Sequence, residues 1–107
     1  GKKLIQRNKI LNEAKLLEDA GVFSIVLECV ESSLAKLITQ TIKIPTIGIG
    51  ASSNCDGQVL VTDDLTGLNP INVRFIKKYS NLRRIIERAV IDYKKEVKNL
   101  KFPKKKY

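Results

Sequence analysis

Three short apolar segments constrain the fold most strongly, because each is rich in residues that favour extended backbone. They lie at residues Phe23–Cys29, Thr46–Gly50 and Gln58–Val61, and Pro45 opens the second one. The first segment is apolar on both faces of an extended chain, which is typical of a strand buried in a parallel sheet. We therefore expect three buried strands.

Amphipathic helical patterns flank these strands. The first helix is predicted to end at about Ala20, where Gly21 suits a C-terminal cap. A second helix is predicted to begin at Ser32 or Ser33, since either hydroxyl could cap it. The apolar positions that define the helical faces are Ile10, Leu11, Ala14 and Leu17 in the first helix, Leu34, Leu37, Ile38 and Ile42 in the second, and Leu82, Ile85, Ile86, Ala89, Val90, Tyr93, Val97 and Leu100 in the last.

Two helices and a tail are predicted in the C-terminal part of the chain. A short helix is expected over Val73–Tyr79. Phe102 and Pro103 are expected to stop the long last helix, because proline cannot continue it. Residues 103–107 are expected to form a frayed basic tail.

The order of these elements predicts an α/β protein with a parallel sheet. A length of 107 residues allows one domain at most, or part of one. Three parallel strands with so few helices make a poor core, and the first helix has no strand before it. We therefore expect the chain to be the C-terminal part of a larger α/β barrel or doubly wound sheet.

Composition narrows the possible functions. The chain has no histidine, which excludes Cys-His zinc sites and Ser-His-Asp triads within it. The two cysteines are expected to be reduced, as in a cytosolic protein. A net charge of +9 permits nucleic-acid binding, but the basic residues are dispersed and there are few aromatic residues, so this role is not favoured. Apolar runs such as Ile25–Leu27 are too short to span a membrane.

Glu28 is the strongest candidate for a catalytic residue. It ends an apolar strand, and α/β proteins place their active sites at that edge of the sheet. Partial burial there would favour a raised pKa and a role as general base. The alternative is a structural salt bridge. Gly48 and Gly50 could let a ligand approach the backbone, although a loop that needs glycine explains them better.

The remaining polar candidates favour structural roles. Asp56–Gly57 is predicted to form a turn before the third strand. Asp63–Asp64 could bind a metal ion, but no other ligand clusters with them, so a solvated loop or a helix cap is favoured. Cys29 and Cys55 are interpreted as packing residues, because no histidine can activate either thiol.

Three sequence blocks resemble the ketopantoate hydroxymethyltransferase family. They are Ile25–Val30 (IVLECV), Ile44–Ala51 (IPTIGIGA) and Cys55–Val61 (CDGQVLV), in the order and spacing of that family. Glu18–Gly21 and Phe102–Pro103 also fit, so the resemblance covers nearly the whole chain. Two departures are visible: the family usually has proline at the position of Glu31 and histidine at that of Asp63.

The resemblance implies a (β/α)8 TIM barrel of about 250 residues, of which this chain would supply the last three strands and their helices. It implies transfer of a hydroxymethyl group from 5,10-methylenetetrahydrofolate to α-ketoisovalerate, giving ketopantoate for pantothenate and coenzyme A biosynthesis. Mg²⁺ would chelate the keto acid. Glu28 matches the family's proton acceptor.

The resemblance also implies that other functional residues lie outside this chain. The metal ligands and the substrate-contacting serine and lysine would precede Gly1, so we expect the chain to be inactive alone. A cytoplasmic homo-oligomer is implied, with the last helix contributing to subunit contacts. Two rival hypotheses are a small basic nucleic-acid-binding module and a different metal-enolate TIM-barrel enzyme.

Overall fold

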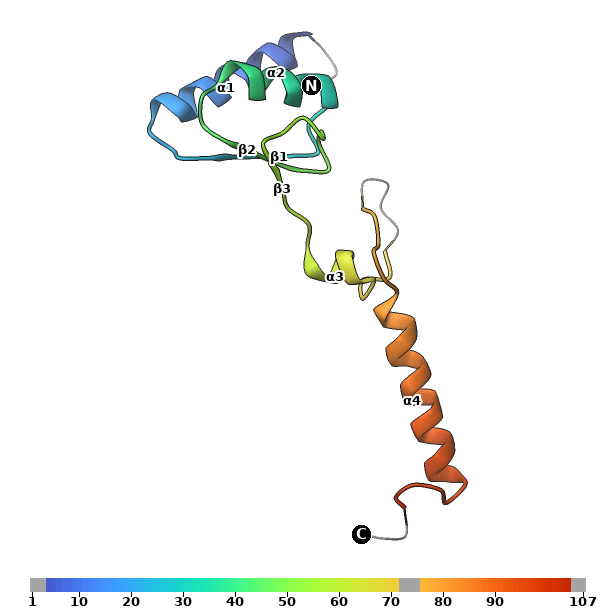
Figure 1. Ribbon diagram of the computed structural model, residues 1–107. Coiled ribbons are helices and arrows are strands. Elements are labelled where there is room, and N and C mark those ends of the chain that lie inside the picture. The colour runs from blue at the N-terminus through green and yellow to red at the C-terminus, as the bar shows by residue number, and fades with distance from the viewer. Residues whose placement is uncertain (1–3, 72–75, 105–107) are drawn as a thin grey trace. The chain divides into compact units, whose positions relative to one another are not determined.

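The computed structural model describes residues 4–71 and 76–104, which form two compact units that divide between Leu60 and Val61. The first unit contains α1 (Leu4–Asp19), β1 (Ile25–Glu28), α2 (Ser32–Thr41), β2 (Thr46–Ile49) and β3 (Gly57–Gln58). The second contains α3 (Thr62–Thr66) and α4 (Leu82–Lys98) (Figure 1). No helix in the described ranges has the length and apolar content needed to cross a membrane.

The first unit is an α/β structure, as predicted. Its three strands form a parallel sheet in the order β1-β2-β3. In the register of this sheet, Ile25 pairs with Thr46 and Glu28 pairs with Ile49. Among the described residues no strand pairs with the other side of β1, so β1 is an edge strand. The third strand is shorter than the predicted Gln58–Val61, although the Val59 N–H still donates to the Gly48 carbonyl over 3.0 Å.

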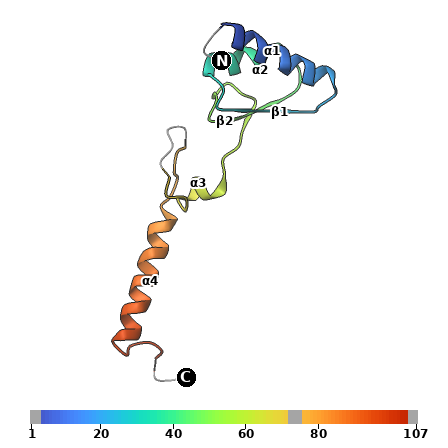
Figure 2. The same cartoon turned by 180° about the vertical axis from the view of Figure 1, so that it is seen from behind.

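Helices α1 and α2 lie side by side on one face of the sheet (Figures 1 and 2). The core between them and the sheet consists of seven buried residues, namely Ala14, Ile25, Leu27, Leu34, Ala35, Ile38 and Ile42. Within the described residues, this core is small for an α/β unit. It supports the expectation that three strands bury little apolar surface.

The expectation that β1 is buried on both faces is wrong for this structure. Burial alternates along the strand: Ile25 and Leu27 are buried against the helices, whereas Val26 is 60% exposed and Glu28 is also exposed. Both helices that pack on the sheet in the first unit cover the same face. The apolar character of Val26 therefore marks a sheet face that the described residues leave uncovered.

The end of α1 follows the predicted capping rule. Gly21 has a φ of +96°, which a residue with a side chain rarely adopts. The Gly21 N–H donates to the Glu18 carbonyl over 3.0 Å and the Val22 N–H donates to the Leu17 carbonyl over 3.4 Å. This is the hydrogen-bond pattern of a Schellman motif. It turns the chain from α1 towards β1.

In the second unit, α4 begins one residue after Asn81, whose side chain accepts a hydrogen bond from the Arg84 N–H over 3.3 Å. The helix ends at Lys98, before the predicted stop, and Leu100 lies beyond it with a φ of +58°. Phe102 returns to pack edge-to-face on Tyr93, with 5.2 Å between the ring centroids. No residue of α4 is buried within the described structure.

Two expectations for this unit fall partly outside the described residues. The predicted helix over Val73–Tyr79 is not seen at residues 76–79, which have no regular structure, and its first three residues lie outside the described ranges. Of the predicted frayed tail, only Pro103 and Lys104 are described, and both are exposed. The short helix α3 was not predicted.

Candidate functional site

Glu28 occupies the place that the sequence predicted, at the carboxyl end of β1. The Cys29 N–H donates to the Ile49 carbonyl over 3.0 Å, so the pairing with β2 holds the backbone on both sides of Glu28. The side chain lies on the uncovered face of the sheet and is exposed. The partial burial that we expected around this carboxylate is therefore not provided by the described part of the chain.

An apolar groove of about 300 Å³ runs along the unpaired edge of β1. Its walls include Ile10, Ala14 and Leu17 from α1, and Ile25, Leu27 and Glu28 from β1. The backbone N–H and C=O groups of an edge strand can pair with a further strand. Glu28 thus stands at one end of a groove that has the chemistry to accept another strand.

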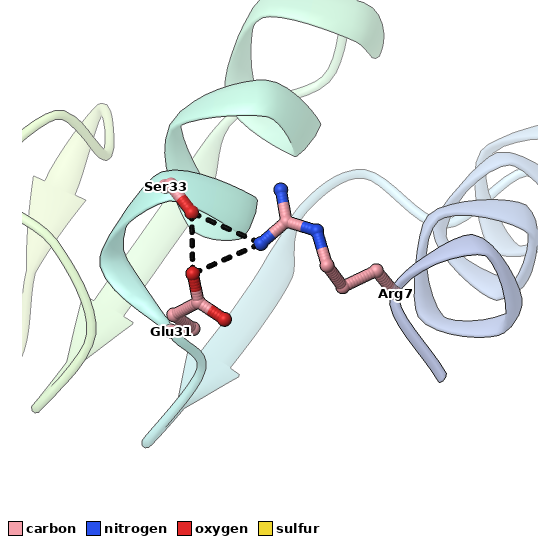
Figure 3. A network of polar contacts seen from close by, with 3 residues as sticks. All are labelled: Arg7, Glu31 and Ser33. Atoms are coloured by element: carbon pink, nitrogen blue, oxygen red, sulfur yellow. Dashed lines mark hydrogen bonds and ion pairs between the residues drawn. The ribbon is translucent and has the colours of Figure 1, made fainter. Parts of the chain in front are cut away.

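A network of polar contacts fixes the loop that follows Glu28 (Figure 3). Arg7 in α1 donates from Nη1 to Glu31 Oε1 and to Ser33 Oγ, each over 3.0 Å. Ser33 Oγ in turn donates to Glu31 Oε1 over 2.6 Å. The hydrogen bond from the Ser33 hydroxyl and, beside it, the charge of the Arg7 guanidinium lower the pKa of Glu31.

This network corrects the prediction for the start of α2. The N-cap is Glu31, whose side chain makes no capping hydrogen bond, and both Ser32 and Ser33 belong to the helix. The Ser33 hydroxyl is used by the Glu31 carboxylate instead of the backbone. Sequence reasoning missed the role of Arg7, because a contact over 24 residues leaves no local pattern.

Gly48 lies within β2 and Gly50 follows it, and both serve the structure of the protein itself. A Cβ at Gly48 would lie 3.0 Å from Cys55 Sγ and 3.1 Å from Gln58 Oε1. Gly50 has a φ of +62°, which suits the loop that begins there. Gln58 Nε2 also donates to the Ser52 carbonyl over 2.7 Å. The loop explanation therefore holds for Gly50. It is wrong for Gly48, which lies in a strand without a positive φ and is required by its close contacts with Cys55 and Gln58.

Asp56 holds the turn before β3 in place. Its Oδ2 accepts a hydrogen bond from the Thr46 N–H over 2.9 Å, and its own N–H donates to Thr46 Oγ1 over 3.2 Å. Thr46 is fully buried, and its hydroxyl also lies 2.8 Å from that of Thr39. The interpretation of Asp56–Gly57 as a structural turn agrees with these contacts.

Asp63 and Asp64 lie in the first turn of α3, where negative charge is favourable. Asp64 is buried, with 8% exposure, and accepts a hydrogen bond from Asn69 Nδ2 over 2.9 Å, so it is not a solvated loop residue as expected. The N-cap of α3 is Val61, so neither carboxylate caps the helix. Among the described residues, no three histidine, cysteine or acidic side chains come together as a metal site.

The two cysteines differ in their surroundings. Cys55 is partly buried and packs against the core, which agrees with its interpretation as a packing residue. Cys29 is exposed, so that interpretation is wrong for it. Its φ of +53° places a residue with a Cβ in the left-handed region, immediately after Glu28. The backbone is thus strained at the candidate site.

The parallel strands, the flanking helices and the carboxylate at a strand end define an α/β protein of the kind that places its site at one edge of a sheet. The sequence model of ketopantoate hydroxymethyltransferase matches residues 1–105. The chain therefore belongs to the ketopantoate hydroxymethyltransferase family.

Relatives from distant organisms carry the same name, 3-methyl-2-oxobutanoate hydroxymethyltransferase. The protein from Pelagibacter ubique is 65% identical over 107 residues, which cover the whole of this chain and 42% of that protein. The proteins from Carboxydothermus hydrogenoformans and Sulfurisphaera tokodaii are 50% and 51% identical, and the matches cover 39% and 40% of their lengths. The chain thus spans about two fifths of the length of these relatives.

Proposed function

We propose that this chain is the C-terminal part of an enzyme that transfers a hydroxymethyl group from 5,10-methylenetetrahydrofolate to α-ketoisovalerate, forming ketopantoate. The observation that carries the proposal is the position of Glu28. This carboxylate stands at the carboxyl end of a parallel strand, on the uncovered face of the sheet, in a chain of the matching family.

The uncovered surfaces of the first unit support a complete enzyme built as a (β/α)8 barrel. The unpaired edge of β1 and the exposed face that carries Val26 are the surfaces that neighbouring strands of a barrel would cover. The 107 residues cover 42% of the Pelagibacter ubique relative, so that relative has roughly 250 residues, which is the usual size of such a barrel. We propose that 1–107 is one continuous part of that single domain.

In this proposal Glu28 is the general base. Its carboxylate takes the proton from the carbon next to the carbonyl of α-ketoisovalerate. That carbon then forms a bond to the methylene carbon of 5,10-methylenetetrahydrofolate. The bonds from this methylene carbon to the folate nitrogens break, water supplies the hydroxyl oxygen, and tetrahydrofolate leaves. Covering the exposed face of the sheet with the rest of the barrel would remove water from around Glu28, which strengthens a carboxylate as a base.

The described residues do not by themselves fit a magnesium site, because no group of three suitable side chains comes together in them. We therefore place the ligands of Mg²⁺, and the side chains that hold the substrates, in the preceding part of the enzyme. The 107 residues alone are then inactive.

Helix α4 is the proposed subunit contact of a cytoplasmic homo-oligomer. Its apolar positions Ile86, Val90, Tyr93 and Val97 are 41–58% exposed, and they recur at the spacing of one helical face. An exposed apolar face of this length is typical of a surface that another chain covers.

The test is a hybrid enzyme, in which residues 1–107 replace the matching part of the Pelagibacter ubique relative. We expect it to form ketopantoate from α-ketoisovalerate and methylenetetrahydrofolate. The isolated chain should form none under the same conditions. A folded hybrid that binds both substrates without forming product would contradict the proposal, and turnover of the keto acid without the folate would indicate a different metal-enolate enzyme.

A further inference from the structure

The loop between β1 and α2 has an anchor at each end. At its start, the Cys29 N–H donates to the Ile49 carbonyl over 3.0 Å, next to Glu28. At its end, Glu31 is held by Arg7 and Ser33 and is the N-cap of α2. Only two residues separate Glu28 from Glu31, so a displacement of the second anchor is transmitted directly to the first.

The backbone between the anchors is strained, which makes the second anchor necessary. Cys29 has a φ of +53°, a conformation that costs free energy for any residue with a Cβ. Such residues keep their conformation only where the surrounding contacts over-determine it. Without Glu31 held in place, Cys29 can relax towards an ordinary φ, and this rotation moves the end of β1.

Arg7 connects the loop to a different element, because it belongs to α1. The side chain of Arg7 is 26% exposed and that of Glu31 is 45% exposed, and a single nitrogen of Arg7 contacts both loop residues. The network therefore ties the loop to the helix that lines the groove beside Glu28.

We propose that Arg7 and Glu31 are positioning residues, which hold the loop after β1 and thereby set the place of the Glu28 carboxylate. The effect on catalysis rests on the proposed function, whereas the restraint on the loop does not. Glu31 itself touches no reacting atom in this proposal. Glu31 acts only by restraining the backbone of the loop, so a different restraint on the same backbone should replace it.

The backbone of Glu31 offers such a replacement. Its φ is −50°, and a proline ring holds φ at about −65° with a spread of about 15°. Glu31→Pro should therefore keep the loop conformation while removing the carboxylate. Glu31→Ala removes the carboxylate and leaves the backbone free, so the two variants separate restraint from charge.

The experiment compares these variants in the hybrid enzyme. Exposed ion pairs are weak, so we expect Glu31→Ala and Arg7→Ala each to lower kcat by about two- to fivefold, with an unchanged KM for α-ketoisovalerate. Glu31→Pro should restore kcat, and adding Arg7→Ala to it should then have no effect. Lys36→Ala, at an exposed residue of α2, is the control and should behave as wild type.

Hydrogen exchange at the Cys29 amide gives a second readout that does not depend on the reaction. Protection should fall in Glu31→Ala and return in Glu31→Pro. Equal protection in wild type and Glu31→Ala would overturn the positioning role, as would a Glu31→Pro variant as slow as Glu31→Ala. A hybrid that makes no ketopantoate, but shows the expected exchange pattern, would overturn the proposed function and leave the loop restraint standing.

Discussion

Replacing Thr46 by valine should loosen the second strand, because the buried hydroxyl of Thr46 serves two partners. It accepts the Asp56 N–H over 3.2 Å and lies 2.8 Å from the Thr39 hydroxyl. Valine keeps the shape of threonine and removes the oxygen. The Thr46 N–H to Asp56 Oδ2 bond, at 2.9 Å, uses the backbone and remains available.

The expected loss in free energy of local opening follows from the hydrogen bonds that Thr46→Val removes. Each net hydrogen bond contributes about 1 kcal/mol, so two lost bonds cost about 2 kcal/mol, or a factor of about 30 in the local opening equilibrium. Native-state hydrogen exchange on the hybrid enzyme, read by mass spectrometry on peptides across β2 and the turn at Asp56, measures this factor directly.

Thr46→Ser is the matched control, because it keeps the hydroxyl and loses one methyl group. Its cost should be about 1 kcal/mol, or a factor of about 5 in exchange protection. The reasoning is refuted if Thr46→Val exchanges like wild type. It is also refuted if Thr46→Ser loses as much protection as Thr46→Val, since the hydroxyl would then not matter.

Three further predictions concern other parts of the chain. Gly67→Ala should lower the apparent melting temperature by about 5–10 °C, because Gly67 has a φ of +77° and a Cβ there would collide with the backbone carbonyl oxygen of Ser80; a shift below about 2 °C would contradict this. Ser33→Ala should raise the pKa of Glu31 towards its ordinary value of 4.5, as measured by carboxyl NMR titration. Because that pKa is lowered in the folded protein, the stabilisation by Glu31 is present above pH 4.5 and is lost as the pH falls through the folded pKa; an unchanged pKa in Ser33→Ala would exclude the hydroxyl as its main cause. Ile86→Lys should reduce the oligomeric mass in light scattering, whereas Ile91→Lys, which points about 140° away around α4, should not; equal masses for both variants would remove the apolar face from the subunit contact.

The architecture of the first unit could be predicted from local patterns. Helical spacing of apolar residues located α1, and Gly21 marked its end correctly. The three apolar segments located the strands, and the helix between β1 and β2 indicated the parallel pairing of these two. The parallel pairing of β2 with β3 has no such signal, because a loop joins them. The burial of β1 could not be predicted in the same way. An apolar residue such as Val26 indicates that this face of the sheet is covered in the folded protein, but it does not indicate which part of the protein covers it.

The position of Glu28 could be predicted, because it depends on the end of a strand. The Arg7–Glu31 contact could not, because it joins residues that are far apart in the sequence. Glu28 follows from the rule that parallel sheets place functional residues at the carboxyl ends of their strands. The pairing of Arg7 with Glu31 joins residues from two helix ends and has no sequence signature. Helix α3 was missed because five residues are too few for an amphipathic pattern.

Turnover by the Glu28→Gln variant of the hybrid enzyme tests most directly whether Glu28 is the general base. Glutamine keeps the size and shape of the glutamate side chain, so the substitution should leave the folding of the hybrid intact. Loss of a general base should lower kcat by a factor of about 10² to 10⁴, with little change in KM for α-ketoisovalerate. Glu13→Gln, which removes a carboxylate from the same groove, should keep wild-type turnover. A Glu28→Gln variant that retains more than about a tenth of wild-type kcat would contradict the assignment of Glu28 as the base.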